Sequence, residues 1–415
     1  MKDMSSWSRR KFLAAAVMTG TVAGLSACSG AAPTARTFDD WAQVSDQARG
    51  QTVKLWMYGG DQQGNTYIDQ HLVPAAAEVG VKLERVPVAD TKDAMNRVLS
   101  EVQAGTTDGA VDLVWVNGDN FGTGKQAGAW ACGWTSLLPN MALTAPQDPL
   151  LTNDFGTPVE DCEAPWNKAQ FTVVYNAATV ERPPGSIAEL LQWARKNPGR
   201  FTYPAPPDFT GSVFTRQVLN SVSGGYENVP LAFDRSAYED LTPALFDAMS
   251  EVAPALWREG RTYPKSGEEL NALFADGQVD FTMTYGPATL TKLVKDGTYP
   301  PQTTVLELDG GTLGNASFLA VPATSGNQAG AMVVANIALS AEQQATKADP
   351  RIWGQFPVVS AERLDHRQQQ LFEALPTSSV VPAYEVLSRK ANPELSAEWV
   401  SELDQGWRRE LLGGK

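Results

Sequence analysis

Before the midpoint of the 415-residue chain, the sequence reads Ala164-Pro165-Trp166-Asn167-Lys168-Ala169-Gln170-Phe171-Thr172-Val173-Val174-Tyr175-Asn176. Its first half contains a proline, an indole and amide side chains, whereas residues 171–175 are five consecutive strand-forming residues. Patterns of alternating strands and helices lie on both sides of it. The stretch therefore predicts a connection between two lobes, in which Trp166 and Gln170 would contact a solute held between them.

The part of the chain before this stretch has the periodicity of a β-α-β-α-β series. Strands are predicted at residues 52–58, 81–86 and 111–116. Helices are predicted at 38–48, from about residue 66 through His71 to Glu78, and at 90–104. Asn65 or Thr66 is expected to cap the second of these helices. Connections of this kind are right-handed, so the sheet is predicted to be parallel.

Ligands of such open sheets gather at the carboxyl ends of the strands, where turns expose backbone N–H groups. Two of the predicted strands end in polar, glycine-containing turns, for which the alternative reading is ordinary turn chemistry. The candidate solute-binding residues in this half are Tyr58, Gly59, Gly60, Asn65, Asn117, Gly118, Asp119 and Asn120.

A second strand-and-helix unit follows the central stretch. A helix is predicted from Ser186 to Arg195, with Ser186 and Glu189 spaced as a capping box. A short strand near residue 200 should enter a proline-stiffened loop that delivers Ser212 to the start of the next helix. Further strands are predicted at 277–285, 303–308 and 316–322, with 309–315 as a flexible return loop. The candidate binding residues of this half are Asp208, Phe209, Ser212, Tyr285 and Asn315.

Composition indicates a globular protein, since 43% of the residues are hydrophobic and 9% aromatic. Histidine occurs only at His71 and His366, which leaves little material for a zinc site or a His-based triad. We therefore expect no metal centre, no cofactor and no enzymatic activity. A net charge of −14 disfavours nucleic acid and anionic lipid as partners.

The first 28 residues have the order of an export signal. Ser8-Arg9-Arg10-Lys11-Phe12-Leu13 is a twin-arginine pattern, followed by a short apolar run and by Leu25-Ser26-Ala27-Cys28, which has the form of a lipobox. Residues 1–27 are thus a predicted signal peptide and 28–37 a tether that is lipid-anchored through Cys28. An ordinary signal peptide with an incidental cysteine is the alternative. Cleavage would leave 29 basic and 46 acidic residues, a net charge of about −17.

The two remaining cysteines, Cys132 and Cys162, form a pair in a chain predicted to be exported, where disulfides persist. We expect them to be bonded to each other; two buried free thiols are the alternative. Closing a loop of this length should contribute about 3 kcal/mol in the chain-entropy model.

The start of the chain resembles that of bacterial extracellular solute-binding lipoproteins, the receptor components of ABC importers. Several later segments are similar to the YnjB-type branch of that superfamily, and the likeness extends over nearly the whole mature chain. These segments are Asn117-Gly118-Asp119-Asn120-Phe121, Pro165-Trp166-Asn167-Lys168-Ala169-Gln170-Phe171, Phe201-Thr202-Tyr203-Pro204-Ala205-Pro206-Pro207-Asp208-Phe209, Gly314-Asn315-Ala316-Ser317-Phe318 and Gly330-Ala331-Met332-Val333-Val334-Ala335-Asn336.

The resemblance implies an α/β fold of the periplasmic-binding-protein-like type II class, with two lobes and a hinge between them. Residues 38–168 and 314–355 are expected to form the first lobe, and residues 171–310 and 360–415 the second. The implied partners are a small-molecule solute and the permease and ATPase subunits of an importer. The protein is expected to act as a monomer on the outer side of the cell membrane, in a periplasm or at the cell surface.

Cargo in the broader superfamily ranges over sugars, polyamines, metals, oxyanions and thiamine-like vitamins. Aromatic and acidic candidates together favour a cationic or heterocyclic organic solute, such as a vitamin or polyamine, because cations bind aromatic faces. These candidates are Tyr58, Trp166, Phe209 and Tyr285, with Asp61, Asp119 and Asp208 nearby. Each aromatic side chain could instead belong to a core.

Other ligands and other functional classes stay open at this point. An oxyanion could bind at helix starts near Thr66 and Ser212, and iron could bind Tyr58 and Tyr285. A secreted carbohydrate-active enzyme would use two carboxylates. An adhesion lipoprotein would have no cleft.

Overall fold

The computed structural model describes residues 36–286, 289–383, 386–387 and 390–413. The predicted signal peptide, the lipobox with Cys28 and most of the predicted tether lie outside these residues. Residues 32–415 form one compact unit, within which two hydrophobic cores can be distinguished. We refer to the elements around these cores as the first and the second lobe.

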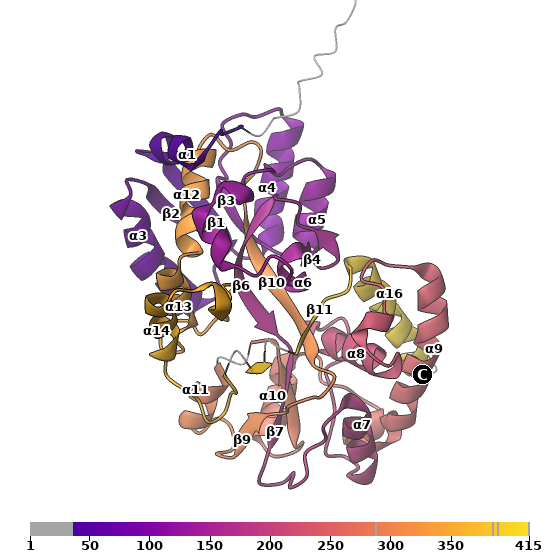
Figure 1. The fold of residues 1–415 in the computed structure, drawn as a ribbon. Coiled ribbons are helices and arrows are strands. Elements are labelled where there is room, and N and C mark those ends of the chain that lie inside the picture. Colours follow the sequence, from indigo (N-terminus) through magenta and orange to yellow (C-terminus); the bar gives the residue numbers. More distant parts are fainter. Residues whose placement is uncertain (1–35, 287–288, 384–385, 388–389, 414–415) are drawn as a thin grey trace, which may run out of the picture. The chain divides into compact units, whose positions relative to one another are not determined.

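The first lobe is built on a mixed sheet with the strand order β11-β10-β3-β1-β2 (Figure 1). Strand β1 pairs in parallel with β2 and β3, as predicted, and β10 runs antiparallel to β3 and β6. The strands are β1 (Thr52–Tyr58), β2 (Lys82–Val88), β3 (Leu113–Val116), β6 (Glu163–Gln170), β10 (Thr312–Ala320) and β11 (Ala391–Pro393). The predicted return loop at 309–315 is wrong in its second half, because β10 already begins at Thr312.

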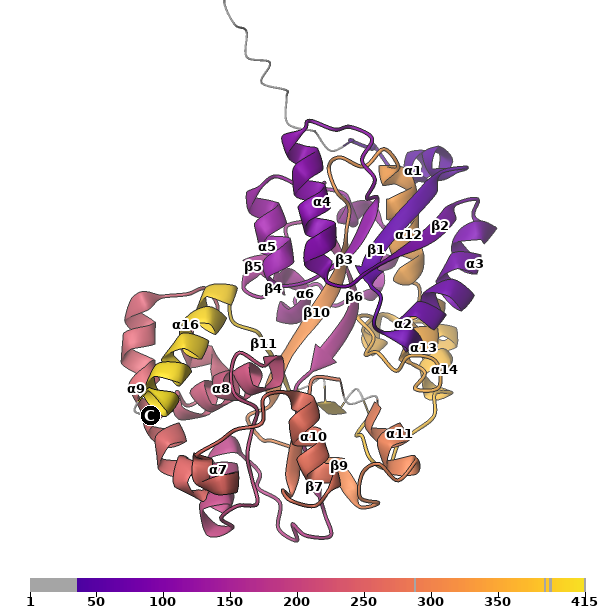
Figure 2. The ribbon, with the colours of Figure 1, turned by 180° about the vertical axis from the view of Figure 1, so that it is seen from behind.

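Helices cover both faces of this sheet. Figures 1 and 2 show α4 and α5 on one side of the strands, and α12 with α1 and α3 on the other. The helices are α1 (Trp41–Ala48), α2 (Gln62–Tyr67), α3 (Val73–Glu78), α4 (Thr91–Gln103), α5 (Asp119–Gln126), α6 (Pro149–Thr152), α12 (Gln328–Ala338), α13 (Ala341–Ala348) and α14 (His366–Glu373). A π-helical turn, Ile68–Leu72, joins α2 to α3.

Helix capping in the first lobe corrects one prediction. The Asp61 carboxylate, rather than Asn65 or Thr66, accepts the Gly64 N–H at 3.0 Å and starts α2. The aspartate precedes the helix by one residue, which is the position from which a side chain reaches the free N–H groups of the first turn.

The second lobe contains a three-stranded antiparallel sheet in the order β8-β7-β9. Its strands are β7 (Thr172–Asn176), β8 (Phe281–Thr284) and β9 (Thr303–Val305). Its helices are α7 (Ile187–Lys196), α8 (Phe209–Val222), α9 (Arg235–Val252), α10 (Gly267–Ala275), α11 (Leu290–Lys295) and α16 (Ala397–Trp407). The predicted strand near residue 200 is absent from this described segment, since residues 201–205 form no ladder.

The central stretch divides into two strands that belong to different sheets. Strand β6 pairs with β10 in the first lobe, and β7 begins after the single residue Phe171 in the second. Strand β10 also spans both cores, because Leu313 is buried in the second and Phe318 in the first. Two crossing strands therefore connect the lobes, as expected for a type II fold with a hinge.

Proline is tolerated in β6 because, among the strands of the described residues, β6 pairs with β10 alone, and the isolated bridge of Lys168 to Phe356 lies beyond Pro165. The pairing is irregular at this point: Ser317 faces Asn167 and Phe318 faces Pro165, so Trp166 is an extra, bulged residue. The bulge turns the Trp166 side chain into the first core, where it has no exposed surface.

The end of the chain divides between the lobes. Trp399, Leu403 and Trp407 of α16 are buried in the second core. Helix α14 instead packs on α13, where Leu371 and Phe372 contact a small cluster that includes Ala341. Residues 360–415 are all expected in the second lobe, but α14 packs on α13 and β11 pairs with β10 in the sheet of the first lobe.

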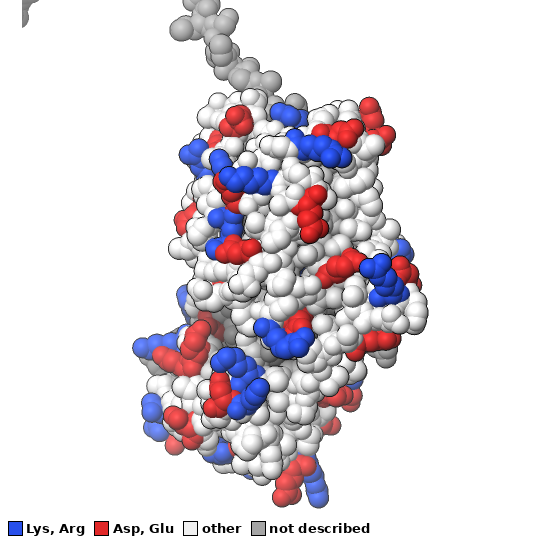
Figure 3. All heavy atoms as spheres, turned by 90° about the vertical axis from the view of Figure 1, so that its left-hand side faces the viewer, with Lys and Arg blue, Asp and Glu red and all other residues white. Residues whose placement is uncertain are grey.

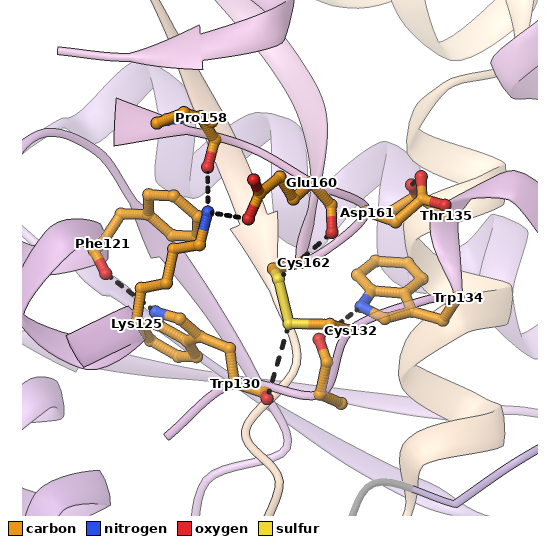
Figure 4. The surroundings of a disulfide bond; sticks show 11 residues. Phe121, Lys125, Trp130, Cys132, Trp134, Thr135, Pro158, Glu160, Asp161 and Cys162 are labelled. Atoms are coloured by element: carbon orange, nitrogen blue, oxygen red, sulfur yellow. Dashed lines mark hydrogen bonds and ion pairs between the residues drawn. A yellow bond between two sulfur atoms is a disulfide. The ribbon is translucent and has the colours of Figure 1, made fainter. Parts of the chain in front are cut away.

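The predicted disulfide between Cys132 and Cys162 is present (Figure 4). It lies beside two buried indoles, whose N–H groups donate to backbone carbonyls: Trp130 to Phe121 and Trp134 to Ala131, each at 3.0 Å. The bond fixes the segment that leads from the small hairpin of β4 (Asn153–Asp154) and β5 (Thr157–Pro158) into β6.

Candidate functional site

The carboxyl ends of β1 and β3 lie at the same edge of the sheet, because the two strands are adjacent and parallel. At the end of β1, Tyr58 is 46% exposed. A Cβ added at Gly60 would lie 2.2 Å from the Tyr58 hydroxyl, so glycine is what allows the tyrosine to fold back over the turn. Asn65 is buried and donates to the Gly59 carbonyl at 2.8 Å, which makes it a support of this turn.

Asp61 is the fixed carboxylate of this turn. One carboxylate oxygen caps α2, and the other accepts the indole N–H of Trp353 at 2.7 Å. Trp353 itself lies in the segment after α13. The sequence analysis missed Trp353 as a site residue, because no turn or periodic pattern near it points to the end of β1.

A cavity of about 210 Å³, here called the strand-end cavity, lies next to Asp61. Asp61, Gln63 and Trp353 line it from the first lobe, and Gly286 and Thr289 line it from the part of the second lobe that follows β8. The remaining lining residues are Lys168 and Ala169 of the crossing strand β6, and Gly354, Gln355 and Phe356.

A second cavity of about 1030 Å³, here called the large cavity, adjoins the first. Its walls come mainly from residues 354–364, from α14 and from residues 375–383. Lys168, Gly354 and Phe356 line both cavities. The Lys168 ammonium donates to the Asp148 carboxylate at 2.5 Å, so a carboxylate balances this cation.

The Asn117–Asn120 turn lies at the end of β3 but does not line either cavity. Gly118, at φ 60°, starts α5 and donates its N–H to both carboxylate oxygens of Asp154 at 2.8 Å. Asn117 and Asp119 are exposed, and Asn120 is half-buried. This turn is therefore organised around a buried carboxylate that the sequence analysis did not single out.

Asp154 and Glu163 form a buried acidic pair behind this turn. Burial, together with the charge of Asp119, raises the pKa of Asp154 to about 7, although the Gly118 N–H acts against the shift. Burial and the neighbouring Asp154 raise the pKa of Glu163 well above its ordinary value. Neither carboxyl oxygen of Glu163 has a hydrogen-bond partner among the described residues.

Trp166, Gln170 and Asn315 lie on the crossing strands but line neither cavity. Trp166 packs edge-on against Trp115 and Trp353, with ring centroids 5.3 Å apart in each pair. Gln170 is buried and donates to the Thr312 hydroxyl at 2.9 Å, and Asn315 is buried opposite Ala169. The predicted contact of Trp166 with a solute is replaced by a role in the core, because the bulge directs its ring inward.

The candidates of the second lobe gather at the start of α8. Asp208 caps this helix by accepting the N–H groups of Thr210 and Gly211, and Ser212 lies within its first turn. Phe209 is 51% exposed, and its ring lies 5.0 Å from that of Tyr285 in an edge-to-face contact.

The hydroxyl group of Tyr285 contacts a buried ion pair. Arg216 and Glu394 are each 1% exposed and form two hydrogen bonds, at 2.8 and 3.1 Å. Tyr285 donates to Glu394 at 3.0 Å, and burial together with this carboxylate raises the pKa of Tyr285 well above its ordinary value. Ser212 accepts from Arg216 and donates to Asp404, so its hydroxyl is also internal.

Two further features bear on what the molecule can do. Within the described residues, no group of three or more His, Cys, Asp or Glu side chains is arranged to hold a metal ion. Across the same part of the chain, no helix combines the length and the hydropathy that a membrane span requires. On the face shown in Figure 3, acidic and basic side chains are interspersed.

The chain matches a known protein family and a curated relative over most of its length. Residues 70–370 match the family described as "Bacterial extracellular solute-binding protein". Protein YnjB of Escherichia coli (strain K12) is 34% identical over 369 residues, which cover 89% of this chain and 93% of YnjB.

Solved structures share the fold at low sequence identity. An ABC transporter structure from Clostridium perfringens has a TM-score of 0.62 at 14% identity and covers 87% of this chain and 99% of that chain. The spermidine/putrescine substrate-binding protein PotD of Streptococcus pneumoniae has a TM-score of 0.58 at 15% identity, covering 87% and 99%. The maltose-maltodextrin binding protein of Alicyclobacillus acidocaldarius has a TM-score of 0.58 at 17% identity, covering 88% and 96%.

Proposed function

This chain belongs to the bacterial extracellular solute-binding proteins, and we propose that it binds a cationic or heterocyclic organic solute in the strand-end cavity. A polyamine or a vitamin has this chemistry. The observation that carries the proposal is that both lobes and the crossing strand β6 contribute lining residues to this cavity. A solute held there would contact both lobes at once and favour their closed arrangement. The closed receptor would then deliver the solute to the permease of an ABC importer.

The preference for a cation rests on the charges and rings at the cavity. Asp61 is held in place by Trp353 and presents a carboxylate to the cavity, whereas the charge of Lys168 is balanced by Asp148. Trp353 lines the cavity but is only 2% exposed, so its part is to hold the Asp61 carboxylate. The half-buried Phe356 is the aromatic residue of the lining that a cation can approach, and a cation over an aromatic face gains about 0.5 to 2 kcal/mol. A preorganised carboxylate beside an indole therefore supports a positively charged solute.

Substitution of Asp61 by asparagine tests this role. Asparagine also caps helices well, so Asp61→Asn should fold while losing the charge that attracts the cation. We expect the best organic cation from a panel of polyamines, vitamins, sugars and oxyanions to stabilise the wild type by about 2.7 kcal/mol at 100 times its Kd. Its affinity for Asp61→Asn should fall at least tenfold, as measured by thermal shift and by calorimetry.

Asp90→Asn is the matched control, because Asp90 caps α4 through Lys92 and does not line either cavity. This variant should bind the solute within twofold of the wild type. Equal affinity in Asp61→Asn and the wild type would contradict the proposed site, and a panel in which no compound stabilises the wild type would contradict the proposed function.

We also propose that the protein is anchored to the membrane through a lipid on Cys28. The order of basic residues, apolar run and cysteine supports this proposal. Cys28→Ser should move the protein from the membrane fraction into the soluble extracytoplasmic fraction, which fractionation and immunoblotting would show. A wild-type protein that is already soluble would count against the anchor.

A further inference from the structure

The two cavities are neighbours that share three lining residues, Lys168, Gly354 and Phe356. Phe356 is half-buried and lines both of them, and its carbonyl accepts the N–H of Lys168 at 3.0 Å, which fixes the segment against β6. The strand-end cavity alone, at about 210 Å³, is below the roughly 300 to 1,000 Å³ of typical pockets for organic ligands. The large cavity, at about 1030 Å³, offers the additional space.

Hydrogen bonds hold the walls of the large cavity in place. On the side of the first lobe, the Val358 N–H donates to the Gln344 side chain at 2.9 Å. On the side of the second lobe, the hydroxyl groups of Thr291 and Ser378 lie 2.7 Å apart, and Ser378 also accepts the N–H of Val380 at 3.0 Å. The cavity is therefore bounded by anchored segments from both lobes, as the strand-end cavity is.

The lining of the large cavity combines apolar side chains with acidic ones. Apolar groups are supplied by Val358, Val359, Leu364, Phe372, Leu375 and Val381. Over both cavities, the charged lining residues are four carboxylates, Asp61, Asp148, Glu362 and Glu373, and one ammonium, Lys168. Apolar walls favour burial of a hydrocarbon or ring body, and the excess of carboxylates favours a positive charge.

We infer that the two cavities are compartments of one binding site whose solute is an elongated amphipathic organic cation. The charged group occupies the strand-end cavity near Asp61, and the apolar body passes Phe356 into the large cavity. This inference rests on the proposed function and narrows its solute class. A short cation would use only the smaller compartment and would therefore bind more weakly.

Three probes of matched chemistry test this inference by calorimetry on the purified protein. Decyltrimethylammonium, below its micellar concentration, should bind at least tenfold tighter than tetramethylammonium, which lacks the apolar body. Decyl sulfate, with the same tail and the opposite charge, should bind at least tenfold more weakly than decyltrimethylammonium. Equal affinity for the two ammonium compounds would overturn the second compartment, and equal affinity for the two decyl compounds would overturn the preference for a cation.

Variants locate the apolar body. Leu375→Lys places a charge in the wall of the large cavity. It should lower the affinity for decyltrimethylammonium at least tenfold, whereas the affinity for tetramethylammonium should stay within twofold of that of the wild type. Ser379→Lys adds the same charge to an exposed neighbour that does not line the cavity, and should leave both probes unchanged. If Leu375→Lys folds poorly, the exposed Glu373→Lys carries the same test. If these substitutions leave the affinity for decyltrimethylammonium unchanged, its tail lies outside the large cavity and the inference is refuted.

The outcomes separate this inference from the proposed function. If short cations bind in a way that depends on Asp61 while the decyl tail adds no affinity, that result would support the proposed function and refute this inference. Absence of binding by any solute or probe would remove both.

Discussion

The free energy of unfolding should depend on pH because of single buried carboxyl groups behind the end of β3. Asp154 has its pKa raised to about 7, so the folded state binds a proton between about pH 4 and 7 that the unfolded chain releases. The stabilisation is complete at low pH and is lost as the pH rises through this range. Glu163 acts in the same direction, because its pKa is also raised.

Asp154→Asn should make the free energy of unfolding depend less steeply on pH. An amide is neutral at every pH and retains one oxygen for the Gly118 N–H, so the variant should be more stable than the wild type at pH 8. Each unit of pKa difference corresponds to about 1.4 kcal/mol, which denaturant unfolding from pH 5 to pH 8 can resolve. The exposed Asp46→Asn serves as the control and should keep the wild-type slope. An Asp154→Asn variant with that same slope would contradict the assignment.

Elements were predicted best where local pattern determines the conformation. Strand β1 occupies 52–58 as predicted, and α7 follows a Ser186 cap whose hydroxyl accepts the Glu189 N–H at 3.2 Å. The Glu189 carboxylate bonds to the Gly185 N–H at 2.7 Å, so the box is displaced by one residue.

Elements were predicted poorly where distant segments decide the outcome. The bulge at Trp166 depends on its pairing with Ser317 and Phe318, which lie far along the chain. Asp208 caps α8 and also accepts the N–H of Gly267, a contact that no local pattern contains. The same limit applies to the candidate site: Asp61 and Gly60 are visible at a strand end, whereas Trp353 joins them only through the tertiary fold.

At the scale of the whole molecule, two cores are joined by crossing strands, and the candidate site lies where one of these strands passes between the lobes. Lys168 and Ala169 of β6 line the strand-end cavity together with residues of each lobe. A solute bound there is coupled to the arrangement of the lobes, because it contacts groups on both.

A crystal structure with the tightest-binding organic cation tests the central claim most directly. The account predicts density for the solute between Asp61 and Trp353 of the first lobe and Thr289 of the second, with its positive group facing the Asp61 carboxylate. Density over the Asn117–Asn120 turn instead, or on the surface of one lobe only, would contradict the account.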